Sequence, residues 1–299
     1  MSRDIKIRPV IRETITGAVT MIAPTFLWFL LYASVTTVIG LYGDYGSLFD
    51  NPGLLIGLAL IEVLIALALS CTWAVAVYRR LLPHYSQSSV MSDIGKLIIA
   101  NLLVIMVFIL VVFIVSLFLV IFSGILIVVS GYDPSGSDAA DISGSVAALQ
   151  ASGGIWLIYA VSAAGLAVLI WFGLRLMLYG ASTVVQGRVI VFQSWGLTKG
   201  AVLKIALLAA LLIGAPVVLA IIAGEATSHV LGLETWWSGE GFNFEESATP
   251  VTGGILQSAL GWGLVALYQL PVFLLGHSLA AALYRRLGPE TVDAEATFG

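Results

Sequence analysis

Residues 97–129 read LIIANLLVIMVFILVVFIVSLFLVIFSGILIVV, an apolar run without a single charged side chain. A helix needs about 20 apolar residues to cross the hydrocarbon core of a bilayer, so this run has about ten residues to spare. We expect it to tilt, to protrude, or to break near Ser123-Gly124 and resume at Ile125. Each of these outcomes makes the run one membrane span.

Five other apolar runs are long enough to cross a membrane, since each holds about 20 residues or more. They cover Thr16 to Ile39, Leu54 to Val77, Ile155 to Leu174, Val202 to Ala223 and Gly254 to Leu283. The 299-residue chain is 60% hydrophobic and 10% charged, whereas a soluble domain carries about 25% charged residues. The first run exceeds the roughly 7–15 apolar residues of a signal peptide, so we expect it to be retained. The sequence therefore predicts an all-α integral membrane protein with six transmembrane helices.

The basic residues indicate how the chain is oriented. All 13 Lys and Arg residues fall in segments that six spans would place on one side of the membrane, and the opposite loops carry only acidic charges. Loops with Lys and Arg stay in the cytoplasm, so we expect both termini to be cytoplasmic. The basic positions are Arg3, Lys6, Arg8, Arg12, Arg79, Arg80, Lys96, Arg175, Arg188, Lys199, Lys204, Arg285 and Arg286.

Two helix ends share the pattern Tyr-Arg-Arg-Leu-x-Pro, at residues 78–83 and 284–289. The helices that open the two hairpins also match, because a basic residue lies twelve positions before a proline in each. Those pairs are Arg12 with Pro24 and Lys204 with Pro216. Proline inside a span usually bends the helix, which we expect at Pro24, Pro216 and Pro271.

We interpret residues 1–299 as a single transmembrane domain of three pseudo-repeated helical hairpins. Their bounds are about 10–83, 92–180 and 198–289. The alternative is convergence, because aromatic and basic residues suit any helix end at the cytoplasmic interface. Either interpretation concerns architecture and names no activity.

The segments between the spans carry further predictions. Residues 183–196 are too apolar for a solvated loop and too short to span, so we expect an interfacial segment there. Ser92-Asp93 and Thr198 are placed to cap the helices that follow them. Of the outer loops, about 131–153 and about 224–252, the first is rich in Gly, Ser, Ala and Asp and suits a flexible connection.

The segment Gln193-Ser194-Trp195-Gly196-Leu197-Thr198-Lys199-Gly200 resembles the Ser-Trp-x-Leu-Thr-Arg/Lys-Gly segment of alphaproteobacterial multi-pass inner-membrane proteins. Those proteins are grouped loosely with the membrane domain of glycerophosphoryl diester phosphodiesterases. The resemblance implies a bacterial inner-membrane protein. It does not imply phosphodiesterase activity, since that chemistry belongs to a separate soluble domain and this chain has no polar stretch long enough to form one.

Four polar residues within the spans are candidate functional groups. Glu62 lies inside the second span, where an unpaired charge costs several kcal/mol. It is either a proton, cation or ligand-binding group, or a neutral acid hydrogen-bonded to another helix. Tyr268 is its counterpart if the repeat holds, Gln269 is adjacent to Tyr268, and His277 lies near the cytoplasmic end of the sixth span.

Two surfaces are candidates for binding. Aromatic residues in the last outer loop either belong to an interfacial belt or form a partner surface; they are Trp236, Trp237, Phe242 and Phe244. Basic and aromatic residues at the cytoplasmic helix ends are candidates for contact with lipid head groups. These are Arg79, Arg80, Arg188, Trp195, Arg285 and Arg286.

The sequence predicts no catalytic, cofactor or metal site. The histidines lie at different depths, and the single cysteine, Cys71, lies in an apolar run. Scattered basic residues do not suggest nucleic-acid binding. We expect a non-catalytic accessory or scaffold subunit that meets membrane lipids, a membrane-protein partner or a second copy of itself. The alternative is a small transporter or channel with Glu62, Tyr268 and Gln269 along its path.

Overall fold

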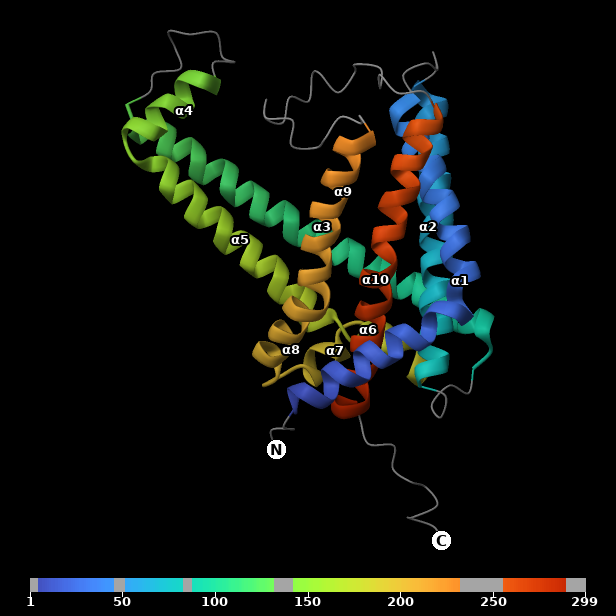
Figure 1. Ribbon diagram of the computed structural model, residues 1–299. Helices are drawn as coiled ribbons and strands as arrows, with labels where there is room; N and C mark the ends of the chain where they lie inside the picture. The colour runs from blue at the N-terminus through green and yellow to red at the C-terminus, as the bar shows by residue number, and fades with distance from the viewer. Residues whose placement is uncertain (1–4, 46–51, 83–87, 132–141, 232–254, 289–299) are drawn as a thin grey trace. The chain divides into compact units, whose positions relative to one another are not determined.

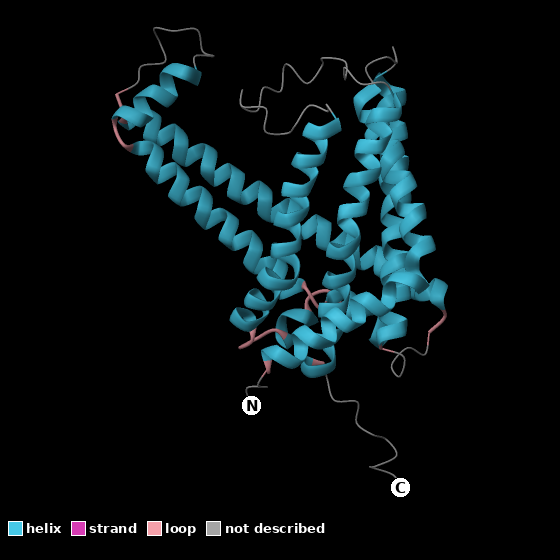
Figure 2. Ribbon diagram, in the orientation of Figure 1, coloured by secondary structure: helices cyan, strands magenta, loops and turns pink. Residues whose placement is uncertain are grey.

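The structure is a computed structural model that describes residues 5–45, 52–82, 88–131, 142–231 and 255–288. All regular secondary structure in these ranges is helical (Figure 2). Six helices are long and apolar enough to cross a membrane. The predicted fold class, a multi-pass all-α membrane protein, is therefore confirmed.

The six spans match the predicted apolar runs and extend beyond them at most ends. In chain order they are α1 (Ile7–Tyr45), α2 (Pro52–Leu81), α3 (Val90–Val129), α5 (Gly154–Leu176), the continuous α8 (Val202–Ala209), η3 (Ala210–Gly214) and α9 (Ala215–Leu231), and α10 (Ile255–Leu287). The fifth span thus combines two α-helices with a π-helical turn. Figure 1 labels these elements.

The chain forms two compact units. Unit 1 consists of Met1–Ala100 and Met177–Gly299, and unit 2 of Asn101–Leu176. The first eleven residues of α3 belong to unit 1, where Asp93, Leu97 and Ala100 are buried. Only residues 97–100 of the third apolar run lie in this unit. The helix α3 continues through Ser123-Gly124 without a break.

The centre of unit 1 is α10, which contacts α1, α2, α9 and the short helix α6 (Tyr179–Gln186). Its core includes Phe29, Trp73 and Leu274, all less than 5% exposed. The ring of Trp73 stacks on Phe273 with centroids 3.7 Å apart. Stacked aromatic rings of this size supply much of the contact energy between helices.

Unit 2 contains α3, α5 and the short helix α4 (Ile142–Ala151). A Cβ atom added at Gly165 of α5 would lie 2.7 Å from Val115 Cγ1 of α3. The absence of a side chain therefore lets the two helices approach closely, as small residues do in membrane proteins. The prediction of a flexible connection is wrong for α4, whose Leu149 is buried.

Two of the three prolines expected to bend a span, Pro24 and Pro216, coincide with distortions. Figure 1 shows that α1 bends, with its N-terminal part lying across the foot of α10 and the rest running alongside α10 and α2. Pro24 in the interior of α1 accounts for this bend. Pro216 follows the π-helical turn η3, in which the Ala215 N–H bonds to Ala210. Proline cannot donate to the preceding turn and its ring crowds that carbonyl, so a widened turn relieves the contact.

The segment predicted to be interfacial is folded. It comprises the end of α6, a turn at Gly187 with φ of +61°, and α7 (Gln193–Leu197). Thr183 Oγ1 donates to the carbonyl of Ile190 and accepts from its N–H, both at 3.2 Å. These two bonds fix the turn between the short helices.

Both predicted helix caps are wrong. Ser89, not Ser92-Asp93, precedes α3, and its Oγ accepts the N–H of Ser92 at 3.3 Å. Thr198 ends α7 by donating to the Ser194 carbonyl at 3.1 Å, and α8 begins later, at Val202. A polar residue at a helix boundary suits either end or a buried contact, so sequence alone did not separate these roles.

Candidate functional site

Three of the four candidate intramembrane residues lie on α10 and bond to other helices. Gln269 accepts a hydrogen bond from the Tyr32 hydroxyl of α1, at 3.2 Å. The Tyr268 hydroxyl lies 3.0 Å from Thr227 Oγ1 of α9. These neighbouring positions therefore connect α10 to two helices on different sides.

His277 connects α10 to α2. Its Nδ1 lies 2.7 Å from the hydroxyl of the buried Tyr78, and the two rings meet edge to face. Phe273 also packs against the imidazole, with centroids 4.2 Å apart. Gly180 of α6 lies beside the same tyrosine, since an added Cβ atom would be 3.0 Å from the Tyr78 hydroxyl. Residues of α2, α6 and α10 thus meet around the Tyr78 side chain.

Glu62 differs from the other three candidates. It is half-buried on α2, beside Ile61 and Val63, which are 55% and 57% exposed. No described residue forms a hydrogen bond or an ion pair with it. The structure therefore brings Tyr268, Gln269 and His277 into helix contacts and leaves Glu62 outside them.

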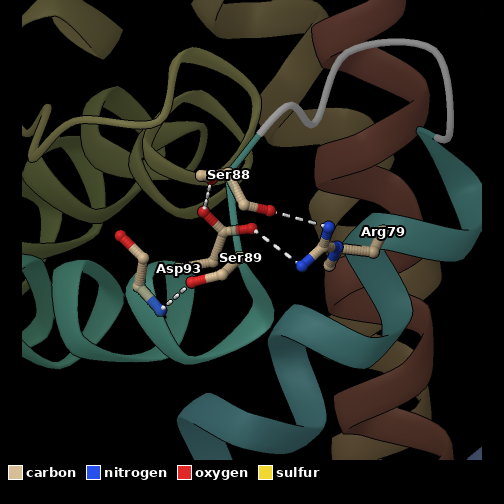
Figure 3. A network of polar contacts seen from close by, with 5 residues as sticks. Arg79, Ser88, Ser89 and Asp93 are labelled. Atoms are coloured by element: carbon tan, nitrogen blue, oxygen red, sulfur yellow. Dashed lines mark hydrogen bonds and ion pairs between the residues drawn. The ribbon is translucent and has the colours of Figure 1, made fainter.

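The end of α2 is clamped to the start of α3 (Figure 3). Arg79 Nη2 donates to the Ser88 carbonyl at 2.9 Å, and Nη1 lies 3.5 Å from Asp93 Oδ2. Ser88 Oγ donates to the other oxygen of Asp93. The Asp93 side chain is completely buried, while Arg79 is 25% exposed. A buried carboxylate is stable only when it is paired and hydrogen-bonded in this way.

The end of α10 carries the second Tyr-Arg-Arg sequence and clamps α1. Arg285 and Arg286 both pair with Glu13, and Arg286 Nη1 lies 2.6 Å from Glu13 Oε2. Arg285 also donates to the Leu81 carbonyl at the end of α2, at 2.7 Å. All three charged side chains are about 30% exposed, so water weakens this cluster relative to the Asp93 pair.

The tyrosines of the two repeated ends both reach α6. Tyr284 accepts a hydrogen bond from Gln186 Nε2 at 3.4 Å. A Cβ atom added at Gly180 would lie 3.0 Å from the Tyr78 hydroxyl, so glycine is needed for this approach. The two contacts lie near opposite ends of one short helix.

The remaining candidate residues fall into three groups. Arg80 and Arg188 are exposed, and Arg188 donates to the nearby Gln186 at 3.2 Å. Trp195 is half-buried on α7. The proposed outer partner surface lies outside the described residues; it comprises Trp236, Trp237, Phe242 and Phe244.

A groove of about 550 Å³ runs along α3 in unit 2. It is apolar except for Ser116 and contains none of the candidate residues. Its lining is Val104, Ile105, Phe108, Ile109, Val112, Phe113 and Ser116. Such a surface suits contact with acyl chains or apolar side chains and offers no chemistry for catalysis.

Sequence reasoning missed Glu13 and the role of Asp93. Both are acidic residues in segments where basic residues predominate, and this mismatch of charge was the available signal. Within the described ranges, no three or more His, Cys, Asp or Glu side chains are grouped so that they could hold a metal ion.

Comparison with known proteins does not place the chain in a family. No family model matches the chain, and no curated protein or solved structure is significantly similar to it.

Proposed function

We propose that this chain is a non-catalytic integral membrane protein that acts as an accessory or scaffold subunit, by lateral binding of lipids or a membrane partner. The observation that carries this proposal is that the candidate polar side chains of α10 bond to other helices. Tyr268, Gln269 and His277 each bond to another helix. Side chains engaged in this way stabilise a bundle and are not available to line a path or bind a substrate.

The proposal places both termini in the cytoplasm of a bacterial cell and the chain in its inner membrane. The distribution of Lys and Arg supports this orientation. The membrane type rests on the resemblance of residues 193–200 to alphaproteobacterial multi-pass proteins. The cytoplasmic side then holds the ends of α2 and α10 and the clamps made by their arginines.

The proposal also retains three pseudo-repeated hairpins as the architecture. Supporting contacts join α1 with α2 and α9 with α10, and Gly165 and Gly173 of α5 approach Val115 and Phe108 of α3 in antiparallel order. The two Tyr-Arg-Arg ends both hold an acidic residue of a different helix. This shared arrangement is what a repeat predicts.

A small transporter or channel is the second candidate, favoured by Glu62 alone. Its carboxylate is half-buried without a described partner, and an intramembrane carboxylate is a common element of proton and cation pathways. This candidate requires transport that depends on Glu62.

Purification of the full chain in a mild detergent tests the proposed lateral binding. After size exclusion, the retained lipids and proteins are identified and quantified by mass spectrometry. We expect one lipid class or one membrane protein to be retained in an amount comparable with the chain itself. A chain that elutes alone and free of lipid would contradict the proposal.

A further inference from the structure

Helix α1 is longer than a membrane crossing requires. Its 39 residues rise about 58 Å, whereas the hydrocarbon core of a bilayer is about 30 Å thick. The part from Thr25 to Tyr45, beyond Pro24, rises about 31 Å and is sufficient for the crossing. Figure 1 shows that the N-terminal part of α1 lies across the foot of α10. We call residues 7–23 the α1 foot.

The inner face of the α1 foot is packed against unit 1. Val10 and Thr14 are fully buried, and Ala18 and Met21 are less than 10% exposed. Glu13 holds the same segment to Arg285 and Arg286 of α10. The α1 foot is therefore a fixed helix with one face left uncovered.

The outer face of the α1 foot combines basic and apolar side chains. Arg8 and Arg12 are exposed near its start. They are followed by Ile15, Val19 and Ile22, which are 46%, 60% and 42% exposed. Along this face the arginines come first and the aliphatic residues follow. A helix that enters the membrane in this order places its charges at the head groups and its apolar side chains in the acyl region.

Arg8 and Arg12 lie four residues apart on the α1 foot, a spacing that suits binding of one anion by both side chains. Residues four apart on a helix have Cβ atoms about 6 Å apart, so two like charges there repel each other. Among the described residues no carboxylate pairs with either arginine, and Glu13 is held by α10. A bound phosphate would remove the repulsion and accept hydrogen bonds from both guanidinium groups.

We propose that the outer face of the α1 foot binds an acidic phospholipid of the cytoplasmic leaflet. Arg8 and Arg12 hold the phosphate of the head group, and Ile15, Val19 and Ile22 lie against the upper acyl chains. The assignment of this lipid to the cytoplasmic leaflet rests on the orientation proposed above. This surface differs from the Arg79, Arg285 and Arg286 positions predicted from the sequence, since those arginines bond within unit 1.

Native mass spectrometry of the delipidated full chain, titrated with phosphatidylglycerol or phosphatidylcholine, tests the proposal. Each basic residue near a membrane surface contributes about fivefold to binding of acidic lipid, so Arg8→Gln/Arg12→Gln is expected to weaken the tightest phosphatidylglycerol site about 25-fold. Binding of phosphatidylcholine should not change. Inorganic phosphate at the same concentrations should not displace the lipid.

The matched control is Lys199→Gln/Lys204→Gln, which removes the same charge from two exposed positions, one after α7 and one in α8. It is expected to change phosphatidylglycerol binding less than threefold. Unchanged lipid binding in the Arg8/Arg12 variant, or an equal loss in the control, would overturn the proposal. A reporter fused to the N terminus tests the orientation separately. An N terminus outside the cytoplasm would refute the proposed topology and the assignment to the cytoplasmic leaflet. A loss of phosphatidylglycerol binding that is specific to the Arg8/Arg12 variant would still support the binding face.

Discussion

The ends of α2 and α10 have the same local sequence and different surroundings. At the end of α2, Arg79 pairs with Asp93, an acid that is completely buried. At the end of α10, Arg285 and Arg286 pair with Glu13, which is 29% exposed. The comparison teaches that a repeated sequence supplies the same arginines, while burial of the partner decides how much each contact stabilises the bundle.

Loss of the buried pair should have the largest effect. Arg79→Met leaves the carboxylate of Asp93 without its counter-charge, which we expect to lower the free energy of unfolding by about 3 kcal/mol. Unfolding of the purified protein in mixed SDS micelles, followed by circular dichroism, measures the change. The double variant Arg79→Met/Asp93→Asn should recover most of it, because no buried charge remains. A loss below about 0.5 kcal/mol in the single variant would mean that Asp93 does not depend on Arg79.

The tyrosines of the two ends provide the second comparison. Tyr78→Phe removes a 2.7 Å contact with His277 and should cost about 1–2 kcal/mol of unfolding free energy, since the imidazole loses its partner. Tyr284→Phe removes a 3.4 Å bond to Gln186 and should cost about 0.5 kcal/mol or less. The same unfolding assay compares them. Equal losses would contradict the idea that the two ends differ.

The partly exposed Glu13 cluster should show a smaller effect than the buried Asp93 pair. Glu13→Gln is expected to lower the free energy of unfolding by about 0.5–1 kcal/mol at low salt, because water and ions weaken pairs that are partly exposed. In about 1 M salt the difference between wild type and variant should shrink, as the Debye length falls to about 3 Å. A loss as large as that of Arg79→Met would show that burial does not separate the two clamps.

The spans were predictable because lipid leaves the backbone no alternative to internal hydrogen bonds, so long apolar runs become helices. Packing was not predictable in the same way. The run at residues 97–129 does not reveal that α3 begins earlier, at Val90, and that its first turns belong to unit 1. The sequence suggests that Asp93 is a helix cap because an acidic side chain near a helix start can accept backbone N–H groups or interact favourably with the helix dipole.

The candidate site was predictable only as a set of residue types. His277 and Tyr78 are 199 positions apart, and no local pattern indicates that they bond. The sequence points to Tyr268 as the repeat counterpart of Glu62 and to Gln269 as its neighbour, but it does not indicate their partners Thr227 and Tyr32. Tertiary contacts between helices therefore account for most of what the sequence left open.

The central claim is that the intramembrane polar groups hold helices together and do not form a transport path. The most direct test reconstitutes the full chain in liposomes that contain a pH-sensitive dye, applies a proton or cation gradient, and compares wild type with Glu62→Gln. We predict that neither protein conducts above protein-free vesicles. Flux in the wild type that Glu62→Gln abolishes would contradict the account and favour a transporter.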